Sequence, residues 1–394
     1  MDLNYSQDQI ALSDLVRNIC HDFCDTTVVR SCEDDALGYA KALWDQLSQS
    51  GLLGIAIDET HGGSKLPMLE SAAIYEQFGY ALAPVPHFVS SVVSALIIDG
   101  GDNTQLQNQL LPGVAAGDII LTPASLEPEG DYEPEGIQTS ATMTSSGYVL
   151  KGVKRHVFYA SSADYLLVLA RTGENKKDID IFLVPRDAKG VQLIQEHSMA
   201  SDCQYRIELN NVIVDTNSRI NAEGDGWRLW SHVLNEAIIL DAASAVGLAE
   251  RALEITVGYA KEREQFDKPI GAFQAIGHYL ADCATAVEGA RALVYEAAWA
   301  HASEKPYAAL ASMAKLFACN TARDVTAKAE QIHGGIGFTM EYDIQLFFRR
   351  AKQQQLNWWD SRYLEKQVAA AVLDSDQPLA VADPFTIEVE SKRS

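Results

Sequence analysis

Two segments in the C-terminal half of the chain combine residue types that suit a dinucleotide ligand. The first, residues 259–274, carries Arg263 on the last turn of a predicted helix that breaks at Pro269. The second, residues 331–338, predicts a helix ending in a glycine-dense turn, where backbone N–H groups can closely approach a phosphate or a flat ring. An arginine and a separate glycine cradle together meet the needs of a dinucleotide pyrophosphate. An exposed helix end or a C-cap would carry similar residues, so neither segment decides the question alone.

Composition indicates a globular protein that is strongly acidic. The chain has 394 residues, of which 47% are hydrophobic and 22% charged, enough for a large core and roughly two or three structural units. Its net charge of −23 gives little long-range attraction for nucleic acid or an anionic membrane, and we expect neither as a partner. A polyanionic ligand would therefore depend on individual arginines.

The cysteines and the N-terminus favour a cytoplasmic protein without a metal. The six cysteines include Cys20 and Cys24, one helical turn apart, but no histidine pair or second close cysteine pair completes a zinc pattern. We expect all six to be reduced. The sequence shows no signal peptide and no transmembrane span of about 20 apolar residues.

The sequence predicts three parts and a tail. Residues 1–118 have helical spacing of apolar residues, with Ser6 as a helix N-cap. Residues 119–222 contain about seven short strand-like runs without a long helical pattern, which favours an antiparallel barrel or sandwich over alternating strands and helices. Helical periodicity returns in residues 223–375, and residues 376–394 have the composition of a tail.

The two candidate nucleotide segments, taken together at this separation, resemble the acyl-CoA dehydrogenase family of flavoproteins. The resemblance extends from residue 1 to about residue 373 and includes the order of the three parts. Shorter motifs also match, and they lie at residues 62–64, 76–79, 152–154 and 246–253.

The resemblance implies an α+β fold whose C-terminal domain is a four-helix bundle. It also implies FAD held between the subunits of a homotetramer or a related assembly, an acyl-CoA substrate, and an electron acceptor of the electron-transfer flavoprotein type. Dehydrogenation across Cα–Cβ needs a base at the α-proton and donors at the thioester carbonyl. A flavin accepts the β-hydride in such enzymes.

The resemblance assigns FAD contacts residue by residue. Arg263 and Gln265 would meet the diphosphate and adjacent groups, and Phe266 would pack nearby. Val157 and Phe158 lie in the segment, beginning at His156, that covers the flavin ring in the family. Two further groups match the adenosine half and the glycine cradle of a partner subunit, and they are Phe273 and Gln274, and Gln331, Gly334 and Gly335.

Neither of the two usual positions for the catalytic glutamate holds an acid in this chain. Most family members place a glutamate on the segment leading into the last helix, where this chain has Trp358. A minority place it ten residues before the glycine of the Val-Gly-Leu motif, where this chain has Ala237.

Three acids are candidates for the missing base. Asp241 lies one turn beyond Ala237, in an otherwise apolar stretch where desolvation would favour proton uptake. Alternatively, Asp241 pairs with an arginine or caps a neighbouring helix. Glu236 is adjacent to Ala237, but one residue rotates a helical side chain by about 100°. Asp360 follows two tryptophans, and we prefer to interpret it as the N-cap of the last helix.

Trp358 and Trp359 begin a stretch that resembles family members from the degradation of steroids and other bulky acyl-CoA compounds. They could floor a substrate pocket or simply pack in a core. Asn235 matches a position that often meets pantetheine. Some of those relatives are mixed complexes of paralogues, which leaves three hypotheses: an FAD-dependent dehydrogenase complete in itself, a subunit that completes a paralogue's site, and a helical binding module unrelated to flavins.

Overall fold

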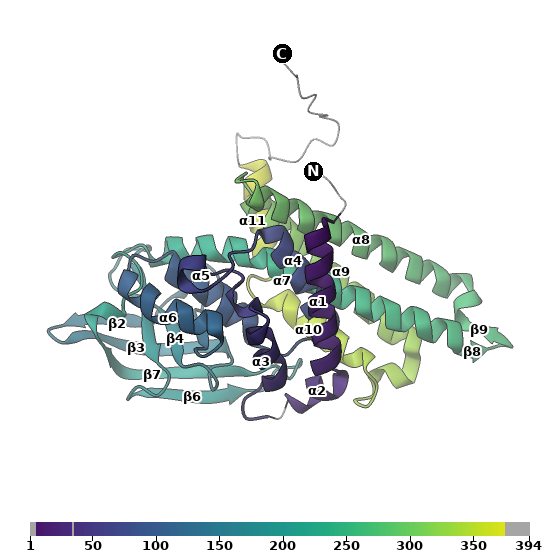
Figure 1. Cartoon of the computed structure of the whole chain (residues 1–394), viewed down its shortest axis with the longest axis horizontal. Helices are drawn as coiled ribbons and strands as arrows, with labels where there is room; N and C mark the ends of the chain where they lie inside the picture. The colour runs from purple at the N-terminus through teal and green to yellow at the C-terminus, as the bar shows by residue number, and fades with distance from the viewer. Residues whose placement is uncertain (1–4, 34, 375–394) are drawn as a thin grey trace, which may run out of the picture.

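The computed structural model describes residues 5–33 and 35–374, and its elements follow the predicted order of helices, strands and helices (Figure 1). Within these residues, the first helical part ends with α6 and helices return with α7 after the strands. The predicted domain boundaries, after residues 118 and 222, fall in the two connections. The predicted tail lies outside the described residues.

The N-terminal helices begin where the sequence offers caps and apolar spacing. Ser6 accepts a hydrogen bond from the Gln9 N–H, and the Gln9 side chain accepts one from the Ser6 N–H, so the predicted N-cap is confirmed as a capping box. Val16 and Ile19 then lie on the buried face of the same helix. The elements of this domain are α1 (Gln7–Phe23), α2 (Thr26–Ser31), α3 (Lys41–Gln49), η1 (Leu52–Gly54), η2 (Glu59–His61), α4 (Met68–Ala81), η3 (Phe88–Ser94), α5 (Ala95–Asp99) and α6 (Thr104–Ala116).

The helix predicted near residues 90–98 begins as a π-helix. η3 forms the wider turns, and α5 continues with α-helical geometry. The hydroxyls of Ser91 and Ser94 are buried in it without a hydrogen-bond partner among the described residues. Because π-helical turns are rare and frequent at functional sites, this segment is a candidate wall of a binding site.

The β domain is one sheet of seven strands in the order β1-β4-β2-β3-β7-β6, with β5 on β4. Most pairs are antiparallel as expected, but β4 pairs in parallel with both β1 and β2, so the sheet is mixed. Two strands predicted within residues 205–214 are one continuous strand, and a strand at 140–144 was not predicted because its residues are mostly exposed and polar. The strands are β1 (Leu121–Ala124), β2 (Ser140–Thr144), β3 (Gly147–Phe158), β4 (Tyr165–Arg171), β5 (Ile179–Pro185), β6 (Val191–Glu196) and β7 (Gln204–Val214).

The C-terminal domain packs long helices around α9. The helix at residues 344–356 was not predicted, because its sequence is rich in glutamine and arginine. The elements are α7 (Gly226–Glu262), the hairpin of β8 (Glu264–Gln265) and β9 (Lys268–Pro269), η6 (Ile270–Ala272), α8 (Gln274–Ala302), α9 (Ala308–His333), η7 (Gly334–Phe338), α10 (Ile344–Leu356) and α11 (Ser361–Leu373).

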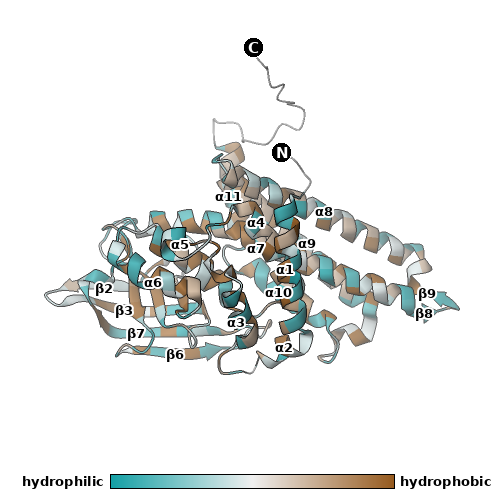
Figure 2. Cartoon of the chain, in the orientation of Figure 1, coloured by the Kyte–Doolittle hydropathy of each residue, from teal (hydrophilic) through white to brown (hydrophobic). Residues whose placement is uncertain are grey.

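Burial explains the apolar character of the central helix. Among the described helices, α7 alone is long and apolar enough to cross a membrane, yet 78% of its most apolar window is buried inside the protein. This is the pattern of a core helix. Figure 2 shows hydrophobic and hydrophilic residues alternating along most other helices and strands, as expected where one face packs on a core. One core joins the two helical domains and a second fills the β domain, and the six cysteines are buried free thiols.

Helices α4 and α7 are in backbone contact through two glycines. A Cβ added at Gly79 would lie 1.8 Å from the carbonyl oxygen of Ser244, and one added at Gly247 would lie 1.8 Å from that of Glu76. No side chain fits in this space. The glycines of the motifs at 76–79 and 246–253 therefore allow the close approach of these helices.

Beside this contact, Glu76 forms a buried ion pair with Arg291 of α8. The guanidinium Nε lies 3.3 Å from Glu76 Oε1, and the same arginine also binds Glu250 and Glu288. Burial raises the pKa of Glu76 from its ordinary value to about 7, although the charge of Arg291 opposes this rise. Folding therefore favours the protonated form of this carboxyl.

Glu76 is expected to make the protein less stable as pH rises from about 5 to about 8. In this window the unfolded chain has released the proton that the folded chain still holds, so the free energy of unfolding falls with pH. The Glu76→Gln variant lacks this titration and should gain about 2–3 kcal/mol relative to the parent protein between these pH values. Urea denaturation of both proteins at both pH values measures the difference. A pH-independent difference would contradict the prediction.

Candidate active site

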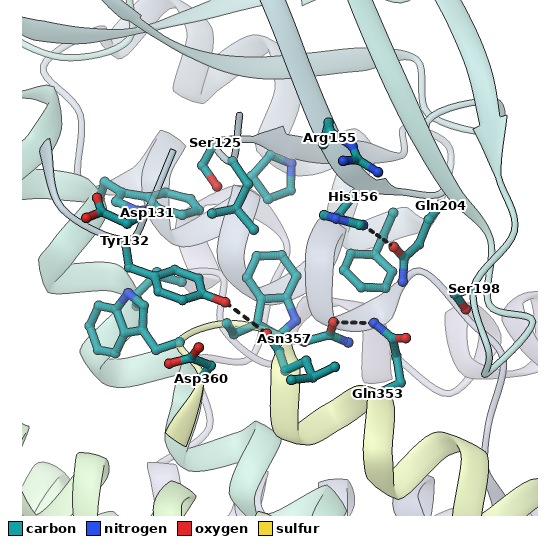
Figure 3. A pocket seen from close by; sticks show the side chains of 18 of the residues that line it. Ser125, Asp131, Tyr132, Arg155, His156, Ser198, Gln204, Gln353, Asn357 and Asp360 are labelled. Atoms are coloured by element: carbon teal, nitrogen blue, oxygen red, sulfur yellow. Dashed lines mark hydrogen bonds between the residues drawn. The ribbon is translucent and has the colours of Figure 1, made fainter. Parts of the chain in front are cut away.

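A cavity of about 410 Å³, here called the junction cavity, lies where the β domain meets the start of α7 and the α10–α11 connection (Figure 3). Its walls are largely aromatic. The strand and loop residues include Ser125, Leu126, Tyr132, Arg155, His156 and Phe158, and the helical side contributes Trp227, Trp230, Leu234, Trp358, Trp359 and Asp360.

An irregularity in β3 directs two of these side chains into the junction cavity. The pairing of β3 with β7 shifts register between Lys154 and Val157, and His156 has a φ of 54°. His156 contacts Gln204 at 2.9 Å, and Phe158 also faces the cavity (Figure 3 labels the first pair). The Val157 side chain packs in the core of the β domain, so only the backbone of this predicted flavin contact could meet a ligand.

A buried ion pair holds the loop after β1, which contributes Ser125 and Leu126 to the wall of the junction cavity. Lys154 is fully buried, and its Nζ donates to Glu127 Oε1 at 2.7 Å and to the Ser125 carbonyl at 3.2 Å. Burial lowers the pKa of Lys154 to about 8, against the opposing charge of Glu127. Glu127 also accepts the N–H groups of Gln138 and Thr139. The loop after β1 is thus held in place from inside the β domain.

The two tryptophans form a turn between α10 and α11. Trp358 and Trp359 have φ values of 50° and 78°, a left-handed conformation that bulky residues rarely adopt. Asp360 follows, and its Oδ1 accepts the Tyr363 N–H at 2.9 Å, which supports its interpretation as an N-cap. Its side chain still borders the junction cavity.

A second cavity of about 180 Å³, here called the inner cavity, lies between α4, the 82–89 segment, α7 and α10. Tyr75 and His87 form its most buried polar pair, with Tyr75 Oη 2.8 Å from His87 Nδ1. His87 Nε2 lies 3.0 Å from the Leu52 carbonyl oxygen, which fixes the proton on Nε2. Burial lowers the pKa of His87 to about 4, so the ring is neutral near pH 7.

Asp241 borders the inner cavity and is paired, as in the alternative that the sequence left open. Lys315 of α9 donates to Asp241 Oδ2, and Gln354 of α10 donates to Oδ1 at 3.0 Å. Burial would lower the pKa of Lys315, but the negative charge of Asp241 raises it above its ordinary value. The expected partner was an arginine, whereas the structure provides a lysine that is fully buried.

The other two predicted residues on α7 point away from both cavities. Glu236 lies 3.4 Å from His301 of α8, and Asn235 donates to the Ser231 carbonyl within its own helix. Leu234, by contrast, faces the junction cavity. The rotation of about 100° per helical residue accounts for this separation. Neither the base assignment of Glu236 nor the substrate contact of Asn235 fits this geometry.

The predicted nucleotide contacts gather at the far tip of the C-terminal domain (Figure 1). Helix α7 ends at Glu262, seven residues before the break predicted at Pro269, because a hairpin with a two-residue turn follows. Phe266 and Asp267 form the turn of this hairpin, with φ values of 54° and 62°. Glycine adopts such left-handed conformations easily, so it is common at the second position of two-residue hairpin turns. Phe266 is 85% exposed. The Arg263 guanidinium makes no hydrogen bond or ion pair within the described residues.

The glycine cradle lies beside this hairpin in the same chain. His333 stacks on Tyr259 with ring centroids 4.3 Å apart, which joins the end of α9 to the end of α7. Gly334 has a φ of 65°, and a Cβ added at Gly334 or Gly335 would meet no atom within 4 Å. Gln331 is exposed one turn earlier. The resemblance assigns the cradle to a partner subunit, and that assignment stays a prediction.

These features leave an open surface that fits a dinucleotide. The guanidinium of Arg263, the turn at Gly334 and Gly335, and the side chain of Phe266 all border open space. Phe273 and Gln274 lie next to them at the start of α8. In Figure 1 this tip and the β domain occupy opposite ends of the molecule.

Comparisons with known proteins agree with this domain order. Models of the N-terminal, middle and C-terminal domains of acyl-CoA dehydrogenases match residues 6–118, 124–212 and 224–357. Benzylmalonyl-CoA dehydrogenase of Aromatoleum aromaticum is 31% identical over 380 residues, which cover 94% of this chain and all of the relative. The chain belongs to the acyl-CoA dehydrogenase family. FAD is the cofactor of this family, and the open tip fits its nucleotide half.

Solved structures of acyl-CoA dehydrogenase family members have the same fold. Butyryl-CoA dehydrogenase from Megasphaera elsdenii superposes with a TM-score of 0.88 at 28% identity, covering 95% of this chain and all of that one. A chain of the ChsE4-ChsE5 complex from Mycobacterium tuberculosis gives 0.87 at 28% identity, covering 96% of this chain and all of its own. The predicted fold class is confirmed, including a helical domain on each side of a β domain in the sequence.

Sequence reasoning missed the residues around Asp241 and the Tyr75–His87 pair. Lys315 carried a usable signal, since it interrupts a run of small apolar residues in a predicted helix and lies four residues before Cys319. No pattern in the sequence indicated the contact between Tyr75 and His87, because it joins two segments across a turn.

Proposed function

We propose that this chain catalyses FAD-dependent α,β-dehydrogenation of an acyl-CoA thioester. The observation that carries the proposal is the pair of adjoining cavities between the β domain and α7, with Trp358 in the wall of both. Bound FAD would accept the β-hydride. Phe158 borders both cavities and Val157 adjoins it, so this segment would meet the flavin ring.

Cationic side chains near the junction cavity could meet the phosphates of a coenzyme A ligand, although the same region also holds four acids, Glu127, Asp131, Glu133 and Asp360. A neighbouring cavity of about 590 Å³ shares Arg155 and His156 with it and is also bordered by Arg362 and Lys366. Local cations matter here because a net charge of −23 repels a polyanion at long range. Trp358 and Trp359 would contact the acyl and pantetheine portions from the opposite wall.

Asp241 is the proposed proton acceptor within this chain. Of the three candidate acids it alone borders the inner cavity, and the Lys315 and Gln354 donors fix the direction of its carboxylate. An ionised, oriented carboxylate is the form a general base requires.

A second candidate function is that of a subunit that completes a paralogue's site. The Lys315 ion pair favours it, because a carboxylate paired with a cation is a weaker base. Trp358 favours it too, since the resemblance places the usual glutamate there. The mixed ChsE4-ChsE5 complex shows that a relative with this fold assembles with a second chain. The proposed assembly is therefore a homo-oligomer or a hetero-oligomer, with an electron-transfer flavoprotein-type acceptor.

Anaerobic titration of the flavin-loaded protein with a panel of acyl-CoA thioesters tests both candidates. Loss of the oxidised flavin spectrum with the lone chain is expected for a complete dehydrogenase. Loss only after a co-encoded paralogue is added would support the second candidate. An unchanged spectrum under both conditions, with short, branched, aromatic and steroid acyl groups all included, would reject dehydrogenation.

A further inference from the structure

The indole ring of Trp358 forms part of the wall between the junction cavity and the inner cavity. Trp358 borders both spaces, together with Phe158, Gln353 and Asn357. Its ring lies 5.6 Å from that of Phe158 with an interplanar angle of 26°, and 5.2 Å from that of Phe88 on the other side. The indole thus fills the passage between a ring of β3 and a ring of η3.

The backbone keeps this ring in place under strain. Trp358 and Trp359 occupy consecutive left-handed positions, which glycine would adopt without cost. Asp360 anchors the following helix through its cap, so the turn has little freedom to relax. Of the two tryptophans, only Trp358 reaches the inner cavity, while Trp359 borders the junction cavity alone.

The space behind the indole is suited to an apolar chain. Leu82, Val85, Phe88 and Leu248 border the inner cavity, and the Tyr75–His87 pair lies in its wall with its hydrogen bonds already made. Such a space would lengthen the acyl site if the passage were open. With the passage filled, an acyl group that enters from the junction cavity must end at the indole.

We infer that Trp358 is a specificity-determining residue that limits this chain to compact acyl groups, either short or ending in a flat ring against the indole, and excludes long straight chains. The inference rests on the proposed function only in taking a coenzyme A thioester as the ligand. Aromatic rings stack well on indole, whereas an alkyl chain gains little there beyond simple contact.

Binding of two thioethers to the flavin-loaded protein tests this inference. S-butyl and S-octyl coenzyme A lack the thioester carbonyl, so calorimetry reports their binding without any dehydrogenation. In the parent protein the octyl compound should bind no more than about threefold tighter than the butyl compound. Trp358→Gly should raise that ratio by about tenfold or more, because burying two extra methylenes already gives a gain of this size.

Trp359→Gly is the matched control. It removes the same side chain from the same type of backbone position but does not connect the inner cavity, so the octyl-to-butyl ratio should stay near the parent value. Adding Val85→Phe to Trp358→Gly should abolish the gain by filling the inner cavity. Where Trp358→Gly fails to fold, Trp358→Leu provides the same comparison.

An unchanged ratio in the folded Trp358 variant, or an equal rise in Trp359→Gly, would overturn the inference. Neither result depends on flavin reduction. A protein that shows the expected binding ratios but is never reduced by thioesters would instead reject the proposed dehydrogenation.

Discussion

Replacing Asp241 with asparagine is expected to destabilise the protein by about 3–5 kcal/mol, the typical cost of leaving one partner of a buried ion pair unpaired. Lys315 has no exposed surface, and its remaining contacts are the Gln354 carbonyl oxygen at 3.4 Å and the Cys319 sulfur at 3.8 Å. Neither replaces a carboxylate. Urea denaturation of Asp241→Asn beside the parent protein measures the effect.

The double variant Asp241→Asn with Lys315→Met separates stability from catalysis. It removes both charges and should recover most of the lost free energy of unfolding, since an apolar side chain can occupy a buried lysine's place. If Asp241 is the base, this folded variant should bind FAD yet lose at least about a thousandfold in the rate of flavin reduction. A double variant with the parent rate would remove Asp241 from the chemistry. A single variant as stable as the parent would show that the ion pair is dispensable.

Replacing Arg263 with glutamine is expected to leave the purified protein largely without flavin. Each hydrogen bond from a guanidinium to a phosphate contributes roughly 1.5–3 kcal/mol, so losing two weakens FAD binding by about a hundredfold or more. The Arg263 backbone bonds Tyr259 and Ile270, but its guanidinium has no partner among the described residues, and therefore the fold should not change. The flavin-to-protein ratio after gel filtration, followed by FAD titration of the apoprotein, gives the result.

Arg323→Gln is the control for that change. Arg323 lies on α9 and pairs with its neighbour Asp324 at the surface, so its loss alters the net charge equally without touching the tip. It should retain parent flavin content. Equal flavin content in both variants would mean that the tip of the C-terminal domain does not hold the diphosphate.

The separation of the two FAD contact regions has a consequence for assembly. Arg263 and Gly334 lie at or after the ends of α7 and α9, whereas Phe158 ends β3 and stacks on Trp358 at the domain junction. Three exposed apolar side chains are suited to contact with another chain: Phe266 of the hairpin, Phe338 of η7, and Met340 beside α2. These surfaces are where we propose that a dimer or higher assembly forms.

Local signals sufficed for much of the fold. Ser6 and Asp360 were identified as helix caps from their residue types and positions, because a cap depends on neighbours within three residues. The glycine turn after α9 was also read from the sequence, because glycine density itself determines where backbone can be exposed. Hydrophobic periodicity did not predict the elements with polar faces, such as β2 and α10. This periodicity indicates burial, and these segments are largely exposed or glutamine-rich.

The sequence by itself determined the order of the domains, the caps, the glycine turns and the residue types available for FAD. The tertiary structure alone decided which groups meet: Lys315 with Asp241, Tyr75 with His87, and Trp358 between Phe88 and Phe158. These pairs lie from 12 to 270 residues apart in the sequence. Their contact depends on how helices cross and where a strained turn directs its side chain, and no local pattern of residues encodes either.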